Sequence, residues 1–85
     1  MSKKTFMEVY SSLRSWSGPD RVLIKWGGKT YLANKADTTY VHQHKYIEMI
    51  TVRRTLEGFT TDTERIYEYE WHKVESVIYE KDQKL

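Results

Sequence analysis

The sequence predicts a small α+β domain in which an N-terminal amphipathic helix packs on an antiparallel sheet. Three observations indicate this class: a capped amphipathic segment at the start, two β-rich runs joined by a glycine pair, and a further β-rich run at residues 46–55. With 85 residues the chain has material for one core, so we expect a single domain that spans residues 1–85. The ends, residues 1–4 and 81–85, are expected to fray.

The first segment carries the signals of a helix. Thr5 precedes Glu8 by three residues, as a capping box requires. Apolar residues then recur at helical spacing: Phe6, Val9, Tyr10 and Leu13. Gly18 followed by Pro19 is predicted to end the helix, because glycine allows a left-handed final position and proline cannot continue the hydrogen-bond ladder.

Residues 21–33 predict a tight β-hairpin. Two runs rich in β-branched and aromatic residues flank Gly27 and Gly28, and glycine tolerates the positive φ angles of a type I′ turn. Pairing across a two-residue turn places Trp26 opposite Lys29. The register of the whole hairpin follows from this pair.

The two faces of this hairpin differ in polarity. One face collects apolar side chains that should meet the helix: Val22, Ile24, Trp26, Tyr31 and Ala33. The opposite face is polar except for Leu23 and Leu32. These two residues are either ordinary surface leucines or a sign that this face is covered too.

The next β-rich run, at residues 46–55, is predicted to be a central strand. It is too short and too β-branched for a helix. Polar, turn-forming residues at 34–39 precede it, and Glu57-Gly58 follow it and break the pattern.

Residues 63–76 admit two interpretations. With a period of two, three aromatic residues share one face of a strand: Tyr67, Tyr69 and Trp71. With a period of 3.6, four residues form a helical stripe: Tyr67, Trp71, Val74 and Ile78. Thr61 with Glu64 is a second candidate capping box, whereas the many β-branched and aromatic residues oppose a helix. In the strand interpretation the segment pairs with residues 46–55 as a long hairpin, and the domain becomes a mostly-β small barrel.

Composition restricts the class of protein. Without cysteine there is no disulfide, thiol nucleophile or cysteine zinc site, as is common in a reducing compartment. Fourteen Lys and Arg against twelve Asp and Glu give a net charge of +2, a faint basic bias. The start lacks the apolar core of a secretory signal, and no apolar run approaches the roughly 20 residues of a membrane span. We expect the protein in the cytoplasm, or in a particle assembled there, and not in a membrane.

No catalytic or metal-binding motif is recognisable. His42 and His44 would face the same side of a strand and offer two imidazoles, but no third ligand can be identified. Carboxylates are candidates for acid–base chemistry only by residue type: Glu48, Asp62, Glu68 and Glu70. Since so small a domain has little room for a cleft, we expect no enzyme activity, no metal, no cofactor and no small-molecule substrate.

Two groups of side chains are candidates for contact with a macromolecule. The first gathers at the predicted hairpin tip and the end of the central strand, where cations could meet phosphates and rings could stack on bases: Lys25, Lys29, Tyr31, Arg53 and Arg54. The second is an aromatic run of the kind common at protein interfaces: Tyr67, Tyr69 and Trp71.

One stretch, ADTTYVHQHKYIEMITVRR at residues 36–54, followed by a Glu-rich segment and VIYEKD at residues 77–82, resembles a known family. The family comprises the small tail-terminator or head–tail joining proteins of siphophages that infect Gram-positive bacteria. Ala36, Asp37 and Tyr40 would correspond to its loop. Three further segments would correspond to a strand, a Glu-rich helix and a last strand: residues 46–51, 63–76 and 77–81.

The resemblance favours the helical interpretation of residues 63–76. It implies a non-enzymatic, phage-encoded protein that acts in tail or neck assembly and contacts copies of itself or neighbouring particle proteins. A second hypothesis is a small phage regulator or inhibitor that binds a host nucleic-acid enzyme, or binds nucleic acid directly. Direct binding would use four cations: Lys25, Lys29, Arg53 and Arg54.

Overall fold

The computed structural model describes residues 4–15 and 21–80, which form one α-helix, one 3₁₀ helix and five strands. In chain order the elements are α1 (Phe6–Leu13), β1 (Arg21–Trp26), β2 (Lys29–Thr38), β3 (Lys45–Thr55), β4 (Gly58–Tyr67), the 3₁₀ helix η1 (Glu68–Lys73) and β5 (Val74–Glu80). The expected helix with an antiparallel sheet is therefore present, and strands dominate, as in the mostly-β alternative. Most of the residues predicted to fray, 1–3 and 81–85, lie outside the described residues.

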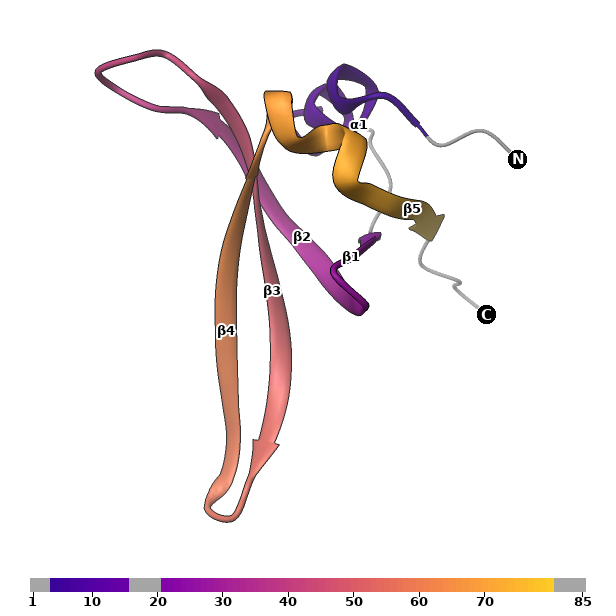
Figure 1. Ribbon diagram of the computed structural model, residues 1–85, viewed down its shortest axis with the longest axis vertical. Helices are drawn as coiled ribbons and strands as arrows, with labels where there is room; N and C mark the ends of the chain where they lie inside the picture. The colour runs from indigo at the N-terminus through magenta and orange to yellow at the C-terminus, as the bar shows by residue number, and fades with distance from the viewer. Residues whose placement is uncertain (1–3, 16–20, 81–85) are drawn as a thin grey trace.

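The five strands form one antiparallel sheet in the order β4-β3-β2-β1-β5. The first four strands follow one another as a meander. η1 then leads the chain past α1 to the opposite edge of the sheet, where β5 pairs with β1 (Figure 1). Residues 46–55 are confirmed as an interior strand, because β3 has a partner on each side.

The start of α1 confirms the capping box. The Thr5 backbone N–H donates to Glu8 Oε1 at 2.8 Å, and the Glu8 backbone N–H donates to Thr5 Oγ1 at 3.2 Å. The helix ends at Leu13, and Arg14 is its C-cap. The predicted stop at Gly18-Pro19 lies outside the described residues.

The hairpin of β1 and β2 confirms the predicted turn and register. Gly27 and Gly28 have φ angles of 60° and 77°, which a glycine pair adopts without strain. Trp26 pairs with Lys29, and the following pairs keep the predicted alternation. The face expected to meet the helix is buried at three positions and partly buried at two: Val22, Ile24 and Tyr31, then Trp26 and Ala33.

The core lies between α1, η1 and one face of the sheet. Its fully buried side chains come from α1 and from the three strands β1, β3 and β4: Val9, Val22, Ile24, Ile47, Met49 and Ile66. Phe6 of α1 meets Trp71 of η1 edge to face, with ring centroids 5.5 Å apart. This contact ties the two covering helices together over the sheet.

The expected helix at residues 63–76 is wrong. The segment is the end of β4, then η1, then the start of β5. Ile66 pairs with Ile47 of β3 and is fully buried there, so the two-residue period holds as far as Tyr67. Thr61, the expected cap, lies within β4 opposite Val52. Pairing along all of β3 outweighs the single local cap that favoured a helix.

α1, with eight residues, is far shorter than a membrane-spanning helix. None of the described segments is a candidate membrane span.

Candidate interaction surface

The sheet divides into two diverging hairpins at one end. β2 and β3 remain paired as far as Leu32 and Ile50. Beyond this pair the two strands separate. β2 remains paired with β1 as far as Lys29, and β3 remains paired with β4 as far as Thr55 (Figure 1). Between the two hairpins lies a hollow of about 390 Å³, which we call the notch, lined by Lys29, Thr30, Thr51, Val52, Arg53, Arg54 and Asp62.

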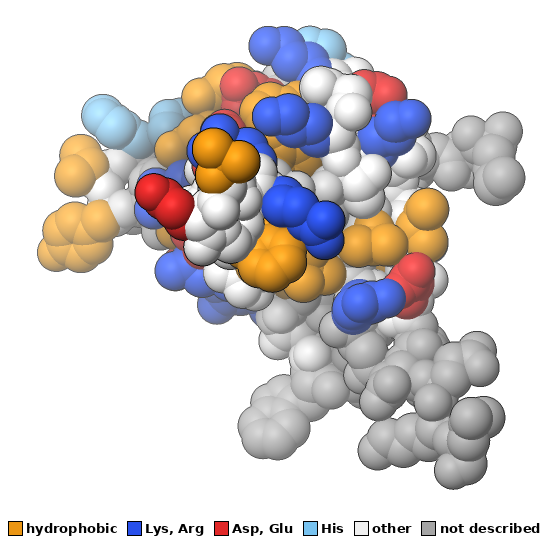
Figure 2. All heavy atoms as spheres, turned by 90° about the horizontal axis from the view of Figure 1, so that it is seen from below, with side chains coloured by type: hydrophobic (Ala, Val, Ile, Leu, Met, Phe, Trp, Pro, Cys, Tyr) orange, Lys and Arg blue, Asp and Glu red, His pale blue; other side chains and the backbone are white. Residues whose placement is uncertain are grey.

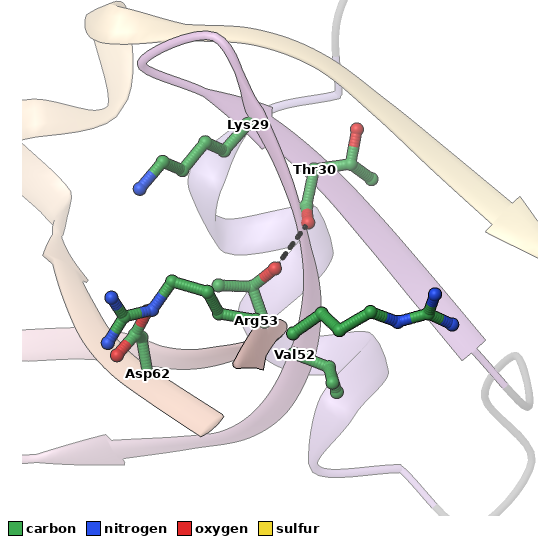
Figure 3. A pocket seen from close by; sticks show the side chains of 7 residues that line it. Lys29, Thr30, Val52, Arg53 and Asp62 are labelled. Atoms are coloured by element: carbon green, nitrogen blue, oxygen red, sulfur yellow. Dashed lines mark hydrogen bonds and ion pairs between the residues drawn. The ribbon is translucent and has the colours of Figure 1, made fainter. Parts of the chain in front are cut away.

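Cationic side chains from two strands meet at the notch. Lys29 stands at the start of β2, and Arg53 and Arg54 follow each other on β3. Lys29 and Arg53 extend on the same side of the notch (Figure 3). Arg53 Nε lies 3.3 Å from Asp62 Oδ2, so the notch has three cations and one carboxylate, a local excess of two positive charges.

One predicted cation stands apart from this group. Lys25 faces β5, where its Nζ lies 4.0 Å from Glu75 Oε1. Glu75 also accepts a hydrogen bond from the Gly28 backbone N–H at 3.0 Å. Three of the four predicted cations are therefore brought together, and the fourth belongs to the β1–β5 side of the sheet.

The end of the β3–β4 hairpin exposes large apolar side chains. Leu56 is fully exposed, and Phe59 and Val52 are 69% and 61% exposed. The Arg54 guanidinium carbon lies 5.5 Å from the centroid of the Phe59 ring. We call these four residues the hairpin tip. Figure 2 looks onto this end of the molecule and shows hydrophobic side chains mixed with Lys and Arg.

Sequence reasoning selected Arg54 of the hairpin tip but missed its apolar members. A signal was available, since Leu56 lies in the two-residue turn Leu56-Glu57 and Phe59 is the second residue after that turn. Residues beside a two-residue turn at the end of a long hairpin have little chance of burial. Apolar residues there are unusual enough to suggest contact with a partner.

Two predicted interaction residues are corrected, because the structure buries them. Tyr31 faces the core and is 7% exposed. Burial raises the pKa of Tyr31, and the nearby carboxylates of Glu64 and Asp62 raise it further. Trp71 also lies in the core, where its indole N–H donates to the Lys4 carbonyl at 2.8 Å. Neither ring is available as a contact surface.

The other two predicted aromatic residues lie in a cluster at the opposite end of β3. The rings of Tyr67 and Tyr69 stack with centroids 5.5 Å apart, and His44 meets Tyr69 edge to face at 5.9 Å. Arg65 lies over the Tyr46 ring at 4.3 Å. A hydrogen bond with Tyr67 is the main cause that raises the pKa of Arg65.

The loop between β2 and β3 adds exposed residues beside this cluster. Tyr40 and Val41 are strongly exposed there. His42 and His44 lie in this loop and not on a strand as expected, and their ring centroids are 5.8 Å apart. Within residues 4–15 and 21–80 no group of three or more His, Asp or Glu side chains is placed to hold a metal ion.

Comparison with known proteins identifies no relative of this chain. No protein-family model, no curated protein and no solved structure matches the chain.

Proposed function

We propose that this chain is a non-enzymatic binding module that presents its hairpin tip to a partner protein. The observation that carries the proposal is the exposure of Val52, Leu56 and Phe59 around Arg54, at the end of a hairpin that extends beyond the core. Folding gains nothing from three large apolar side chains in water. A partner would bury them.

The expected energetics suit a protein interface. Burial of one Val, Leu or Phe side chain contributes about 1.5–3 kcal/mol before the costs of association. Apolar anchors beside an arginine are also typical of the residues that dominate binding energy at protein interfaces. The hairpin tip offers both kinds of group within a few residues of one turn.

Tail or neck assembly is the setting that we propose for this binding. It is supported by the strand part of the resemblance, residues 46–51, which falls on β3. Of the three residues assigned to the family's loop, Tyr40 lies in a loop, whereas Ala36 and Asp37 belong to β2. The Glu-rich helix of the family has no counterpart here, because residues 63–76 form the end of β4, η1 and the start of β5. The proposal therefore rests on the exposed hairpin first and on the resemblance second.

Site-specific photo-crosslinking in the producing cell tests the proposal. A benzophenone amino acid at Phe59 should yield a discrete protein adduct, whereas the same group at Thr63, on the exposed face of β4 but away from the tip, should yield little. The purified adduct partner should then bind the native chain and lose binding to the Leu56→Ser, Phe59→Ser double variant. A chain that remains strictly monomeric in light scattering and forms no protein adduct at Phe59 would contradict the proposal.

A nucleic-acid-binding regulator is the second candidate, favoured by the meeting of Lys29, Arg53 and Arg54 at the notch. Such a site would bind single strands through phosphate contacts, with an affinity that falls steeply with salt. Fluorescence anisotropy with a labelled oligothymidylate at low salt tests it. An unchanged signal would remove this candidate.

A further inference from the structure

We infer that the notch docks an extended, acidic segment of a partner protein, which adds to the exposed edge of β3 as a further strand. This inference deepens the proposed function and rests on it, since it names the class of partner and the mode of binding. Two observations support it: the backbone groups of β3 that face the notch, and the excess of positive charge there.

The strand registers show which backbone groups face the notch. In an antiparallel pair, directly opposite residues alternate between exchanging both hydrogen bonds and pointing their backbone groups away from each other. The two residues on either side of a two-residue turn form a hydrogen-bonded pair, which here is Thr55 with Gly58. By the alternation, Arg54 and Val52 then direct their backbone N–H and C=O groups away from β4. These groups point toward β2.

β2 is not paired with β3 at these positions. Its last pair with β3 is Leu32 with Ile50, and the same alternation, counted from the Gly27-Gly28 turn, directs the Thr30 backbone toward the notch. Thr51 Oγ1 donates to the Thr30 carbonyl at 3.3 Å, the one hydrogen bond drawn across the notch in Figure 3. No described strand pairs with β3 at Val52 or Arg54 on this side. An extended segment would find donors and acceptors there, as in known cases of strand addition.

The side chains define what such a segment should carry. A residue opposite Val52 would lie on the same face as this valine and beside Ile50, so an apolar side chain fits. Residues opposite Arg53 and Arg54 would meet guanidinium groups on alternate faces, so carboxylates fit both. The preferred core of the segment is therefore one apolar residue followed or preceded by two acidic residues, with Lys29 adding positive charge from the other wall.

The outer edge of β4 provides an internal comparison. Thr61 stands opposite Val52, and its backbone groups point away from β3 by the same alternation. This edge carries Asp62, Glu64 and Arg65 along one stretch, which gives no excess of positive charge. An acidic segment should therefore prefer the notch to the free edge of β4.

The test uses a blocked, fluorescein-labelled nonapeptide in which Val-Glu-Glu is flanked by Thr and Ser residues. Fluorescence anisotropy with the full chain should show saturable binding that weakens with salt. A peptide with Val-Lys-Lys at the centre should not bind. Val52→Pro, which removes the N–H that faces the notch, should weaken binding about tenfold or more. Thr61→Pro is the matched control on the other edge and should change binding by less than about twofold.

Charge variants complete the test. Arg54→Glu should weaken binding about tenfold, whereas Lys35→Glu, an exposed position on β2 away from the notch, should act only through the small change in net charge. Thermal unfolding monitored by circular dichroism verifies that each variant is folded. If Val52→Pro fails to fold, Arg54→Glu still tests the inference, because this substitution keeps the backbone N–H groups.

Three outcomes would overturn the inference: no anisotropy change up to about 1 mM peptide, equal weakening by Val52→Pro and Thr61→Pro, or direct binding of labelled oligothymidylate by a chain that does not bind the peptide. The last result would favour the nucleic-acid candidate. If the peptide fails while the Phe59 cross-link to a protein forms, the proposed function stands and only the docking mode is wrong. If both fail, the proposed function is wrong as well.

Discussion

The two halves of β3 differ in what covers them, although they belong to one continuous strand. From Lys45 to Ile50 the core side of the strand is buried, with Ile47 and Met49 fully enclosed. From Thr51 to Thr55 the same side carries Thr51 and Arg53, and four of the five residues are exposed. The change from apolar to polar on the inward positions marks where the core ends. Strand formation therefore continues past the core, and the second half of β3 is free for contacts with other molecules.

The largest expected contrast is between a core position and a tip position on this strand. Ile47→Ala removes a fully buried side chain and should lower the free energy of unfolding by about 2–5 kcal/mol. Val52→Ala should change it by less than about 0.5 kcal/mol, because the valine is mostly exposed. Urea denaturation of both variants measures the contrast. Similar losses at the two positions would show that the tip is part of the folding core.

The cap of α1 should show the next largest effect, since α1 covers the core half of the sheet. Thr5→Ala removes the side chain that accepts from the Glu8 backbone N–H, and we expect a loss of about 1 kcal/mol in urea denaturation. Ser11→Ala, at an exposed position within α1, is the matched control and should be nearly neutral. A loss at Ser11 equal to that at Thr5 would contradict the role of the cap.

The ion pair at the notch should contribute less to stability than the cap. Arg53 and Asp62 have side chains that are 63% and 38% exposed, so solvent and salt screen their attraction. A double-mutant cycle with Arg53→Ala and Asp62→Ala should give a coupling energy of about 0–1 kcal/mol. A larger coupling would mean that the pair holds the hairpin in place, rather than supplying a surface for binding.

The smallest effect concerns pH and the cap. The backbone hydrogen bond from Thr5 is the main cause that holds the pKa of Glu8 below its ordinary value. Because the folded-state pKa is lower than the unfolded one, the stabilisation is present above the unfolded pKa and is lost as pH falls through the folded pKa. The stability difference between the native chain and Glu8→Gln should therefore shrink on acidification. NMR titration of the Glu8 carboxyl measures the pKa directly, and an ordinary value would contradict the prediction.

The correctly predicted parts of the fold are those that short-range chemistry determines. Thr5 and Glu8 indicate a helix cap within four residues of sequence, and Gly27 and Gly28 indicate a tight turn within two. The alternation that follows the turn then fixes which side chains face the helix, and three of these five are buried.

Residues 63–76 could not be assigned from the sequence because the local preferences nearly balanced. Pairing between residues distant along the chain decided the outcome, as in the contact of Ile66 with Ile47. The same segment then changes to a 3₁₀ turn, which places the Trp71 ring against Phe6. Neither the pairing nor the turn has a local signature.

The candidate surface was predicted in part. Lys29, Arg53 and Arg54 were selected by residue type, and the divergence of the two hairpins brings them together at one notch. That divergence depends on the twist of the whole sheet, so the sequence alone could not reveal it. Tyr31 shows the opposite error, since the predicted alternation already placed it on the apolar face with Ile24.

The register shift in β2 has a consequence for how this surface could change during evolution. Ala33 pairs with Met49 and Lys35 with Glu48, so Asn34 is an extra residue that no position of β3 opposes. Loss of that one codon would leave every inward residue in phase, yet it would remove the local bend close to the point where β2 and β3 separate. We expect such a deletion to flatten the sheet and slow amide exchange at Val52, which hydrogen–deuterium exchange would detect. The separation of β2 and β3, and with it the space for an added strand, would then depend on the presence of Asn34.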